Sequence, residues 1–230
     1  MIPAQNHLIG RLPPRDRDRL MAACEPVELT LAQLLDEAGT ALRHVYFPID
    51  GFVSLVSRVD EHPGLEVGMV VREGMVGTAL VLGVPCSPSR SVVQGAGSSW
   101  RIGAAAFRRE LKASTALRQQ LALYLYVLMA QTVSSAGCLR FHRVGQRLAR
   151  WLLMSQDRAH QQQFHVTHEF LASMLGVRRV GVTVAAGDLQ RRGLIRYHRG
   201  ELTVVDRPGL EAAACSCYAA DCKVYQQHLG

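Results

Sequence analysis

The sequence predicts an α+β protein in which a β-rich N-terminal domain, a long helix and a C-terminal winged helix-turn-helix follow one another. Three observations support this order. Residues 26–107 contain short apolar or alternating runs separated by turn residues, which favour an antiparallel sandwich or barrel. Residues 114–136 lack Gly and Pro and are rich in helix formers. Residues 168–187 meet the packing requirements of two closely crossing helices.

The composition is that of a globular protein. Hydrophobic residues make up 48% and charged residues 20% of 230 residues, which argues against a disordered chain. The densest apolar run, residues 121–130, is too short for a membrane span. The N-terminus lacks the apolar core of a secretory signal, and six scattered cysteines do not suggest a disulfide scaffold. We therefore expect a cytoplasmic protein that does not associate with membranes.

The positive charge is confined to one part of the chain. Residues 139–207 contain twelve arginines and five acids, and 12 − 5 = +7 equals the net charge of the whole chain. A basic segment attached to a neutral one suggests an anionic partner, either nucleic acid or anionic lipid, although a solvated basic face is the alternative.

The expected elements can be placed along the chain. A short helix is predicted at residues 15–23 after Pro13-Pro14, and strands at residues 27–35, 44–47, 52–56, 65–71 and 91–94. A second long helix is predicted at residues 144–158, with a hinge near Cys138 because Gly137 interrupts the helical pattern.

The helix predicted at residues 114–136 is apolar on two faces. Leu117, Leu121, Tyr124 and Leu128 follow the 4-3-4 spacing of a coiled-coil seam, whereas Leu123, Val127 and Ala130 make another face apolar. A helix with two apolar faces needs two partners. We predict that the seam dimerises with a second copy and that the other face packs on the β domain; a single core helix in a monomer is the alternative.

The helix-turn-helix prediction depends on small and apolar positions. Ala172 allows a close crossing and Gly176 tolerates positive φ in the turn. Thr167 is placed to cap the first helix, with Phe170 as its third residue. The inward positions are all apolar: Leu171, Leu175, Val177, Val182 and Ala185.

Two alternating runs follow the second helix. Residues 193–198 and 201–205 flank Arg199-Gly200, which predicts a basic hairpin and therefore a winged helix with Arg199 near its tip. Gly181 and Gly187 lie inside the expected recognition helix, and each costs about 1 kcal/mol relative to Ala.

This order of parts resembles the CRP/FNR superfamily of bacterial transcription regulators. The resemblance is most specific at residues 146–153 and 170–179, and residues 44–48 before Gly51 look like the first sensor hairpin. It implies a jelly-roll sensor with the cyclic-nucleotide-binding fold (1–113), a dimerisation helix and hinge (114–143) and a DNA-binding domain (144–230). It also implies a homodimer, palindromic operator DNA and RNA polymerase as a candidate partner.

The base-reading residues match the family only in part. Arg179 matches the first arginine of the recognition helix in the cyclic-AMP-responsive members, but Val180 and Val184 stand where those members have Glu and a second Arg. We expect Arg179 to read guanine, Arg178 to contact phosphate and Val180 to contact a thymine methyl. The predicted DNA-binding residues are Arg178, Arg179, Val180, Thr183, Val184 and Arg199.

The effector site departs further from the family. Gly77-Thr78 replaces the Gly-Glu that holds the ribose, whereas Arg90-Ser91 matches the phosphate-binding pair. We therefore expect that cyclic AMP is not the effector. Another anionic ligand, or a sensor without a small-molecule ligand, remains open.

No residue set indicates catalysis, so we do not expect an enzyme. Cys215, Cys217 and Cys222, with His228 nearby, are weak candidates for zinc or an iron-sulfur cluster, because Cys-x-Cys-x4-Cys is not a common spacing. The sequence favours structural thiols and no metal.

Two other functions remain open. A regulatory module of the cyclic-nucleotide-binding type without DNA function would leave the basic winged helix unexplained. A non-specific DNA-packaging protein would leave the β domain unexplained.

Overall fold

The computed structural model describes residues 6–58, 60, 64–159 and 163–230. It divides into two compact units: residues 1–57, 67–129 and 228–230 form the first, and residues 58–66 and 130–227 form the second. We call them the sensor unit and the C-terminal unit, and we describe each by itself.

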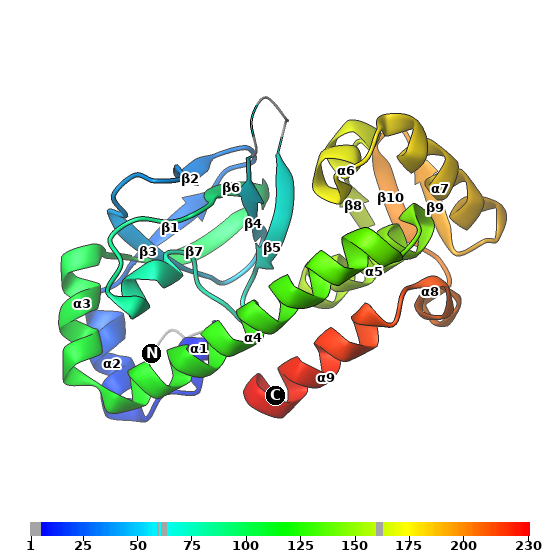
Figure 1. The fold of residues 1–230 in the computed structure, drawn as a ribbon. Helices are drawn as coiled ribbons and strands as arrows, with labels where there is room; N and C mark the ends of the chain where they lie inside the picture. Colours follow the sequence, from blue (N-terminus) through cyan, green and yellow to red (C-terminus); the bar gives the residue numbers. More distant parts are fainter. Residues whose placement is uncertain (1–5, 59, 61–63, 160–162) are drawn as a thin grey trace. The chain divides into compact units, whose positions relative to one another are not determined.

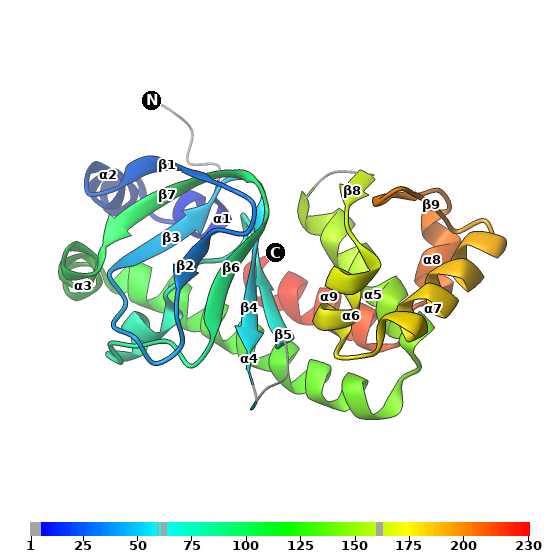
Figure 2. The ribbon, with the colours of Figure 1, turned by 90° about the horizontal axis from the view of Figure 1, so that it is seen from above.

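The sensor unit contains two antiparallel sheets (Figure 2). One has the strand order β1-β7-β3 and the other the order β2-β6-β4-β5. The strands are β1 (Glu25–Leu29), β2 (Leu34–Asp36), β3 (His44–Pro48), β4 (Phe52–Ser57), β5 (Leu65–Val70), β6 (Arg90–Gly95) and β7 (Gly97–Gly103). The helices before and between them and after β7 are α1 (His7–Gly10), α2 (Pro14–Ala22), the 3-10 helix η1 (Thr78–Leu82) and α3 (Ala104–Ala113).

Side chains from both sheets share one core. Leu29 and Tyr46 come from the first sheet, and Val53, Val70 and Val93 from the second. All are buried, so the two sheets pack face to face. The predicted antiparallel sandwich is confirmed.

The structure refines the sequence prediction in this unit. The run predicted at residues 27–35 is divided between β1 and β2, and Ala32, with φ 64°, lies in the turn between them. The two halves consequently belong to different sheets. Strand β7 and helices α1 and α3 were not predicted, because Gly97–Gly103 is polar and rich in glycine and α1 is only four residues long.

The long helix α4 (Thr115–Phe141) extends beyond its predicted end. The interruption predicted at Gly137 is wrong, because a helical Gly costs only about 1 kcal/mol and the helix continues through Cys138. Among the described residues α4 alone is, by itself, long and apolar enough to cross a membrane, a test that core helices of soluble proteins also pass.

The predicted dimer seam on α4 is also wrong. Leu117, Leu121 and Tyr124 are buried inside the sensor unit and Leu128 is half-buried, so they do not present a face to a partner. The Tyr124 hydroxyl, for example, lies 3.4 Å from the carbonyl oxygen of Met75. The helix has two apolar faces, and the spacing alone did not reveal which one packs on its own domain.

The opposite face of α4 is exposed. Its side chains recur at a 4-3-4-3 spacing along the helix, and we call this set the exposed seam: Ala122, Tyr126, Met129, Val133 and Ala136. This spacing is that of the a and d positions of a coiled coil. The exposed seam, and not the predicted one, is available to a second copy.

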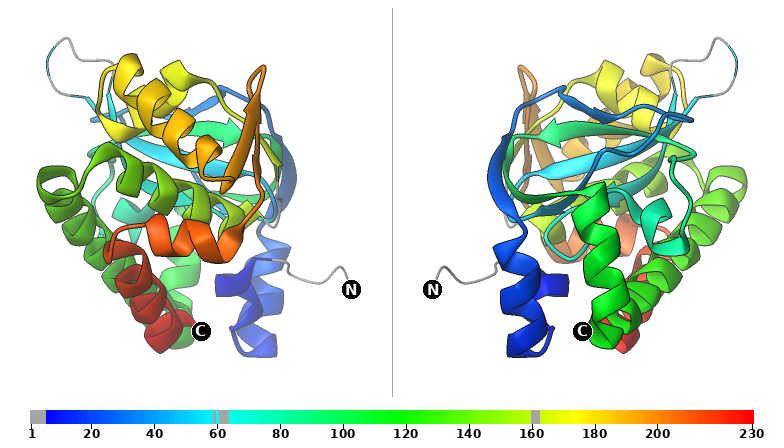
Figure 3. Two further views of the ribbon diagram at one scale, coloured as in Figure 1. Left: turned by 90° about the vertical axis from the view of Figure 1, so that its right-hand side faces the viewer. Right: turned by 90° about the vertical axis from the view of Figure 1, so that its left-hand side faces the viewer.

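After the C-terminal part of α4, the C-terminal unit contains α5 (Val144–Ala159), close to its predicted bounds, and a three-stranded sheet of order β8-β10-β9 (Figures 1 and 3). Its further elements are β8 (Gln163–His165), α6 (His168–Leu175), α7 (Arg179–Arg191), β9 (Ile195–His198), β10 (Glu201–Val204), α8 (Arg207–Ala213) and α9 (Cys217–Leu229). The predicted helix-turn-helix and hairpin are therefore present. β8, α8 and α9 were not predicted.

Helix α5 is the scaffold of this unit. The rings of Trp151 on α5 and Phe170 on α6 pack edge to face with centroids 5.9 Å apart. Arg207 at the start of α8 forms an ion pair of 2.6 Å with Asp157. Both ends of the winged helix are thereby attached to α5.

Candidate nucleic-acid interface

The turn between α6 and α7 has the predicted geometry. Gly176 adopts φ 60°, which favours glycine, and the axes of the two helices differ by 107°. The Thr167 hydroxyl accepts a hydrogen bond of 3.0 Å from the Phe170 amide, as expected for the helix cap. Of the inward positions, Leu171, Leu175, Val182 and Ala185 are buried and Val177 is half-buried.

One face of α7 is exposed and carries most of the predicted DNA-binding side chains. Val180 and Val184 are 72% and 66% exposed, although both are apolar. Arg178, Arg179 and Thr183 are exposed beside them. The fold thus brings these five residues together on the N-terminal half of α7, which we call the recognition surface.

The start of α7 is electrostatically unfavourable for the isolated protein. Arg178 is the N-cap residue and makes no capping hydrogen bond, and the first turn contains no acidic residue. Two cations at the positive end of a helix dipole oppose its field, which costs about 0.3–1 kcal/mol each. In the described part of the chain neither Arg178 nor Arg179 forms an ion pair. This end of the helix is therefore suited to an anion.

The hydroxyl of Thr183 is already engaged inside the protein. It lies 3.0 Å from Nδ1 of His168 and donates to the carbonyl oxygen of Arg179 at 3.1 Å. Burial, with the nearby charge of Arg179, lowers the pKa of His168 and so favours its neutral imidazole. His168 also stacks on Tyr197, with ring centroids 4.7 Å apart. This set of contacts joins α6, α7 and strand β9.

The wing is a two-residue hairpin. Arg199 and Gly200 have φ values of 49° and 87°, as a type I′ turn requires, and His198 pairs with Glu201 across it. The Arg199 side chain is exposed at the tip and, within the described residues, has no carboxylate partner. Arg191 and Arg192, in contrast, both pair with Asp188.

The residues expected at the effector site occupy two elements of the sensor unit. Gly77, with φ 90°, precedes Thr78 at the start of η1. Arg90 and Ser91 begin β6, where Nε of Arg90 lies 3.0 Å from Oε2 of Glu37. Ser91 pairs with Asp36, and burial raises the pKa of that carboxyl to about 6. The predicted phosphate-binding pair therefore lies beside two acidic side chains.

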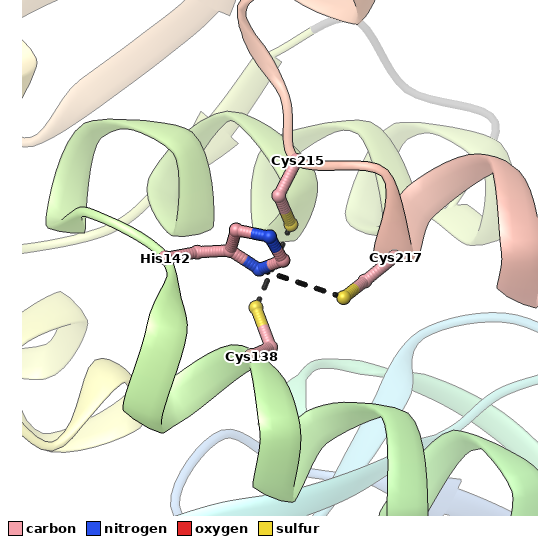
Figure 4. A group of neighbouring side chains, drawn as sticks. All are labelled: Cys138, His142, Cys215 and Cys217. Atoms are coloured by element: carbon pink, nitrogen blue, oxygen red, sulfur yellow. Dashed lines mark hydrogen bonds between the residues drawn. The ribbon is translucent and has the colours of Figure 1, made fainter.

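The C-terminal cysteines have different neighbours from those expected. Cys215 and Cys217 lie together with Cys138 and His142, whereas Cys222 lies outside this group (Figure 4). His228 instead packs against the ring of Tyr126, with centroids 4.8 Å apart. The sequence analysis missed Cys138 and His142; their spacing of four residues at a helix end was the available signal.

These features define a class: a β-sandwich domain followed by a long helix and a basic winged helix-turn-helix. Residues 146–213 match the model of the Crp-like helix-turn-helix domain. No curated protein matches the sequence. The match assigns a Crp-like helix-turn-helix domain to residues 146–213, and the two units have the fold of CRP/FNR-family regulators.

Solved structures share this fold at low sequence identity. FixK2 from Bradyrhizobium japonicum has a TM-score of 0.72 and 12% identity over 84% of this chain and 98% of its own. The global regulator CLP from Xanthomonas campestris, described as responsive to c-di-GMP, has a TM-score of 0.69 and 17% identity over 84% of this chain and 99% of its own. A CRP/FNR-family transcriptional regulator from Thermus thermophilus has a TM-score of 0.67 and 23% identity over 83% of this chain and 98% of its own.

Proposed function

We propose that this protein is a cytoplasmic, sequence-specific transcription regulator that binds palindromic operator DNA as a homodimer and catalyses no reaction. The observation that carries the proposal is the recognition surface, where unpaired arginines and exposed valines lie side by side on α7. The valine side chains form no hydrogen bonds with water, but they can pack against thymine methyl groups in a major groove. The adjacent arginines supply the charge that phosphates attract.

Within this proposal the residues have separate tasks. Arg179 reads a guanine through a bidentate contact, and Val180 and Val184 contact thymine methyl groups. Arg178 at the N-terminus of α7, and Arg199 at the wing tip, contact phosphates. Thr183 chiefly holds α7 to His168, because its hydroxyl is engaged there.

Dimerisation follows from the exposed seam of α4. Tyr126, Met129 and Val133 expose apolar surface at coiled-coil spacing on a helix whose other face is buried. Pairing of two such helices around a two-fold axis places two recognition helices on one DNA duplex.

Two features of the sensor unit argue against cyclic AMP as its ligand. Thr78 offers no carboxylate for a ribose, and Glu37 already neutralises Arg90. We propose that cyclic AMP does not control this protein. The sensor unit either binds a chemically different ligand or binds no small molecule.

Footprinting on the DNA that flanks the protein's own gene tests the proposal. Protection of a discrete palindrome supports a sequence-specific regulator. Uniform protection would instead indicate a packaging protein, and absence of protection at micromolar protein would indicate a regulatory module without DNA function.

A further inference from the structure

Four potential ligand atoms converge at the end of α4. Cys138 lies in its last turns, His142 directly follows it, Cys215 lies in the linker before α9, and Cys217 begins α9 (Figure 4). Their three sulfurs and one imidazole nitrogen all lie within 4.8 Å of one another. Cys138 and Cys215 are buried, and the other two are half-buried. From this arrangement we propose that Cys138, His142, Cys215 and Cys217 bind one zinc ion in a closed site.

The separations between the ligand atoms agree with a tetrahedral ion. Zn–S bonds of about 2.3 Å and Zn–N bonds of about 2.0–2.1 Å place two sulfurs about 3.8 Å apart, and a sulfur and a nitrogen about 3.6 Å apart. The Sγ atoms of Cys138 and Cys215 are 3.5 Å apart, and Sγ of Cys217 lies 3.6 Å from Nδ1 of His142. Only small adjustments are needed to receive the ion.

The type of ligand selects the metal. Three thiolates and one imidazole favour zinc over the hard cations magnesium and calcium, and four protein ligands leave no open position for a substrate. An iron-sulfur cluster would distribute its ligands over two or four iron atoms, so ligands on different iron atoms would lie farther apart than the ligand atoms of this group. The site is therefore structural and mononuclear.

The charge around the site also balances. Zn²⁺ with three thiolates carries 2 − 3 = −1. The neighbouring buried side chains are Arg147, Arg150 and Asp221, which add 2 − 1 = +1. Both arginines interact electrostatically with Cys138.

The ion would connect segments that are distant in sequence. Cys138 and His142 precede the winged helix, and Cys215 and Cys217 follow it, so zinc would join the two ends of the DNA-binding region. Close to the site, Arg147 donates a hydrogen bond to the carbonyl oxygen of Leu175, the last residue of α6. Zinc would thereby fix the linker before α9 and support the scaffold that carries the helix-turn-helix.

Metal binding by the full chain, reduced and without DNA, tests the inference independently of the proposed function. We expect one zinc per chain by elemental analysis. Cobalt should give visible bands of a tetrahedral site and a sulfur-to-metal charge-transfer band, and zinc should displace it. X-ray absorption at the zinc edge should show three sulfur neighbours at about 2.3 Å and one nitrogen at about 2.0–2.1 Å.

Single substitutions identify the ligands. Cys217→Ser and His142→Ala should each weaken zinc binding roughly a hundredfold or more, because losing a ligand costs at least as much as losing a residue that supports one. Cys222→Ser is the matched control, since this half-buried cysteine lies on α9 outside the group, and it should retain one zinc per chain.

Several results would overturn the inference. The inference is wrong if the reduced wild-type protein binds no zinc, binds cobalt in octahedral geometry, or carries an iron-sulfur chromophore. Unchanged zinc binding in both ligand variants, or a disulfide between Cys138 and Cys215 that persists in reductant and prevents metal uptake, would equally contradict it.

Discussion

Nε of Arg90 lies 3.0 Å from Oε2 of Glu37, so the arginine that matches a cyclic-phosphate ligand already has an anionic partner. The contact between Arg90 and Glu37 is an ion pair, and the Arg90 Nε–H is not aligned for a hydrogen bond. A cyclic nucleotide would have to displace Glu37 and would find no carboxylate at Thr78 for its ribose. We predict no binding of cyclic AMP at micromolar concentrations. Calorimetry that gave a dissociation constant below ~10 μM, or about −7 kcal/mol, would contradict this.

Asp36 should make the stability of the sensor unit depend on pH. Burial raises the pKa of its carboxyl to about 6, above the ~4 of an unfolded chain, so the folded state holds the proton more tightly. Stability should therefore fall as the pH rises from about 4 to about 6 and remain lowered above that range.

The variant Asp36→Asn removes this effect. It should raise the free energy of unfolding by about 2–3 kcal/mol at pH 8 and by less than about 1 kcal/mol at pH 4. Urea denaturation at both pH values measures the difference. An equal gain at the two values would show that the carboxyl of Asp36 is not responsible.

The exposed seam should hold the dimer together. The double variant Met129→Asp, Val133→Asp places charges where two apolar helices would meet, so we expect a folded monomer by analytical ultracentrifugation. Leu121→Asp is the contrasting variant. It buries a charge in the sensor unit and should lower the free energy of unfolding by several kcal/mol. A dimer that persists in the double variant would exclude this seam.

We expect glycine at position 187 to be required for DNA binding and not for folding. A Cβ atom added there meets no other atom within 4 Å, so no contact in the protein requires glycine. Gly187→Ala should stabilise α7 by about 0.5–1 kcal/mol but weaken operator binding, because Gly187 lies on the same exposed face of α7 as Val180 and Val184 and an added methyl group would meet the groove wall. Gly181→Ala is the matched control: it has equal space but is half-buried, and it should leave operator affinity unchanged.

Local patterns predicted much of the C-terminal unit. The turn at Gly176, the cap at Thr167 and the hairpin at Arg199-Gly200 depend on residues adjacent in sequence, and all three are present. The seam of α4 was assigned to the wrong face for the opposite reason. Which of two apolar faces packs on the sensor unit depends on Met75 and other residues far away in sequence.

The group of three cysteines and one histidine could not be predicted from the sequence for the same reason. Cys138 and Cys215 are separated by the whole winged helix, and only the fold brings their sulfur atoms to 3.5 Å. The spacing within the C-terminal segment suggested Cys222 instead, but that side chain lies outside the group. Long-range proximity of this kind is not encoded in any short motif.

Arg179 and Arg199 separate base reading from phosphate binding. Arg179 begins the exposed face of α7, so Arg179→Ala should cost about 1–3 kcal/mol per half-site on the operator and little on random DNA. Arg199 lies at the wing tip, so Arg199→Ala should weaken both kinds of DNA similarly and reduce the salt slope by roughly 1.

The most direct measurement is the titration of wild type and both variants on operator and random duplexes at several salt concentrations. The operator is expected to be a palindrome with half-site centres about 10–11 base pairs apart. We predict that Arg179→Ala loses discrimination between the two duplexes and that Arg199→Ala preserves it. Equal weakening of both duplexes by Arg179→Ala would show that α7 does not read bases through this residue and would contradict a sequence-specific regulator of this design.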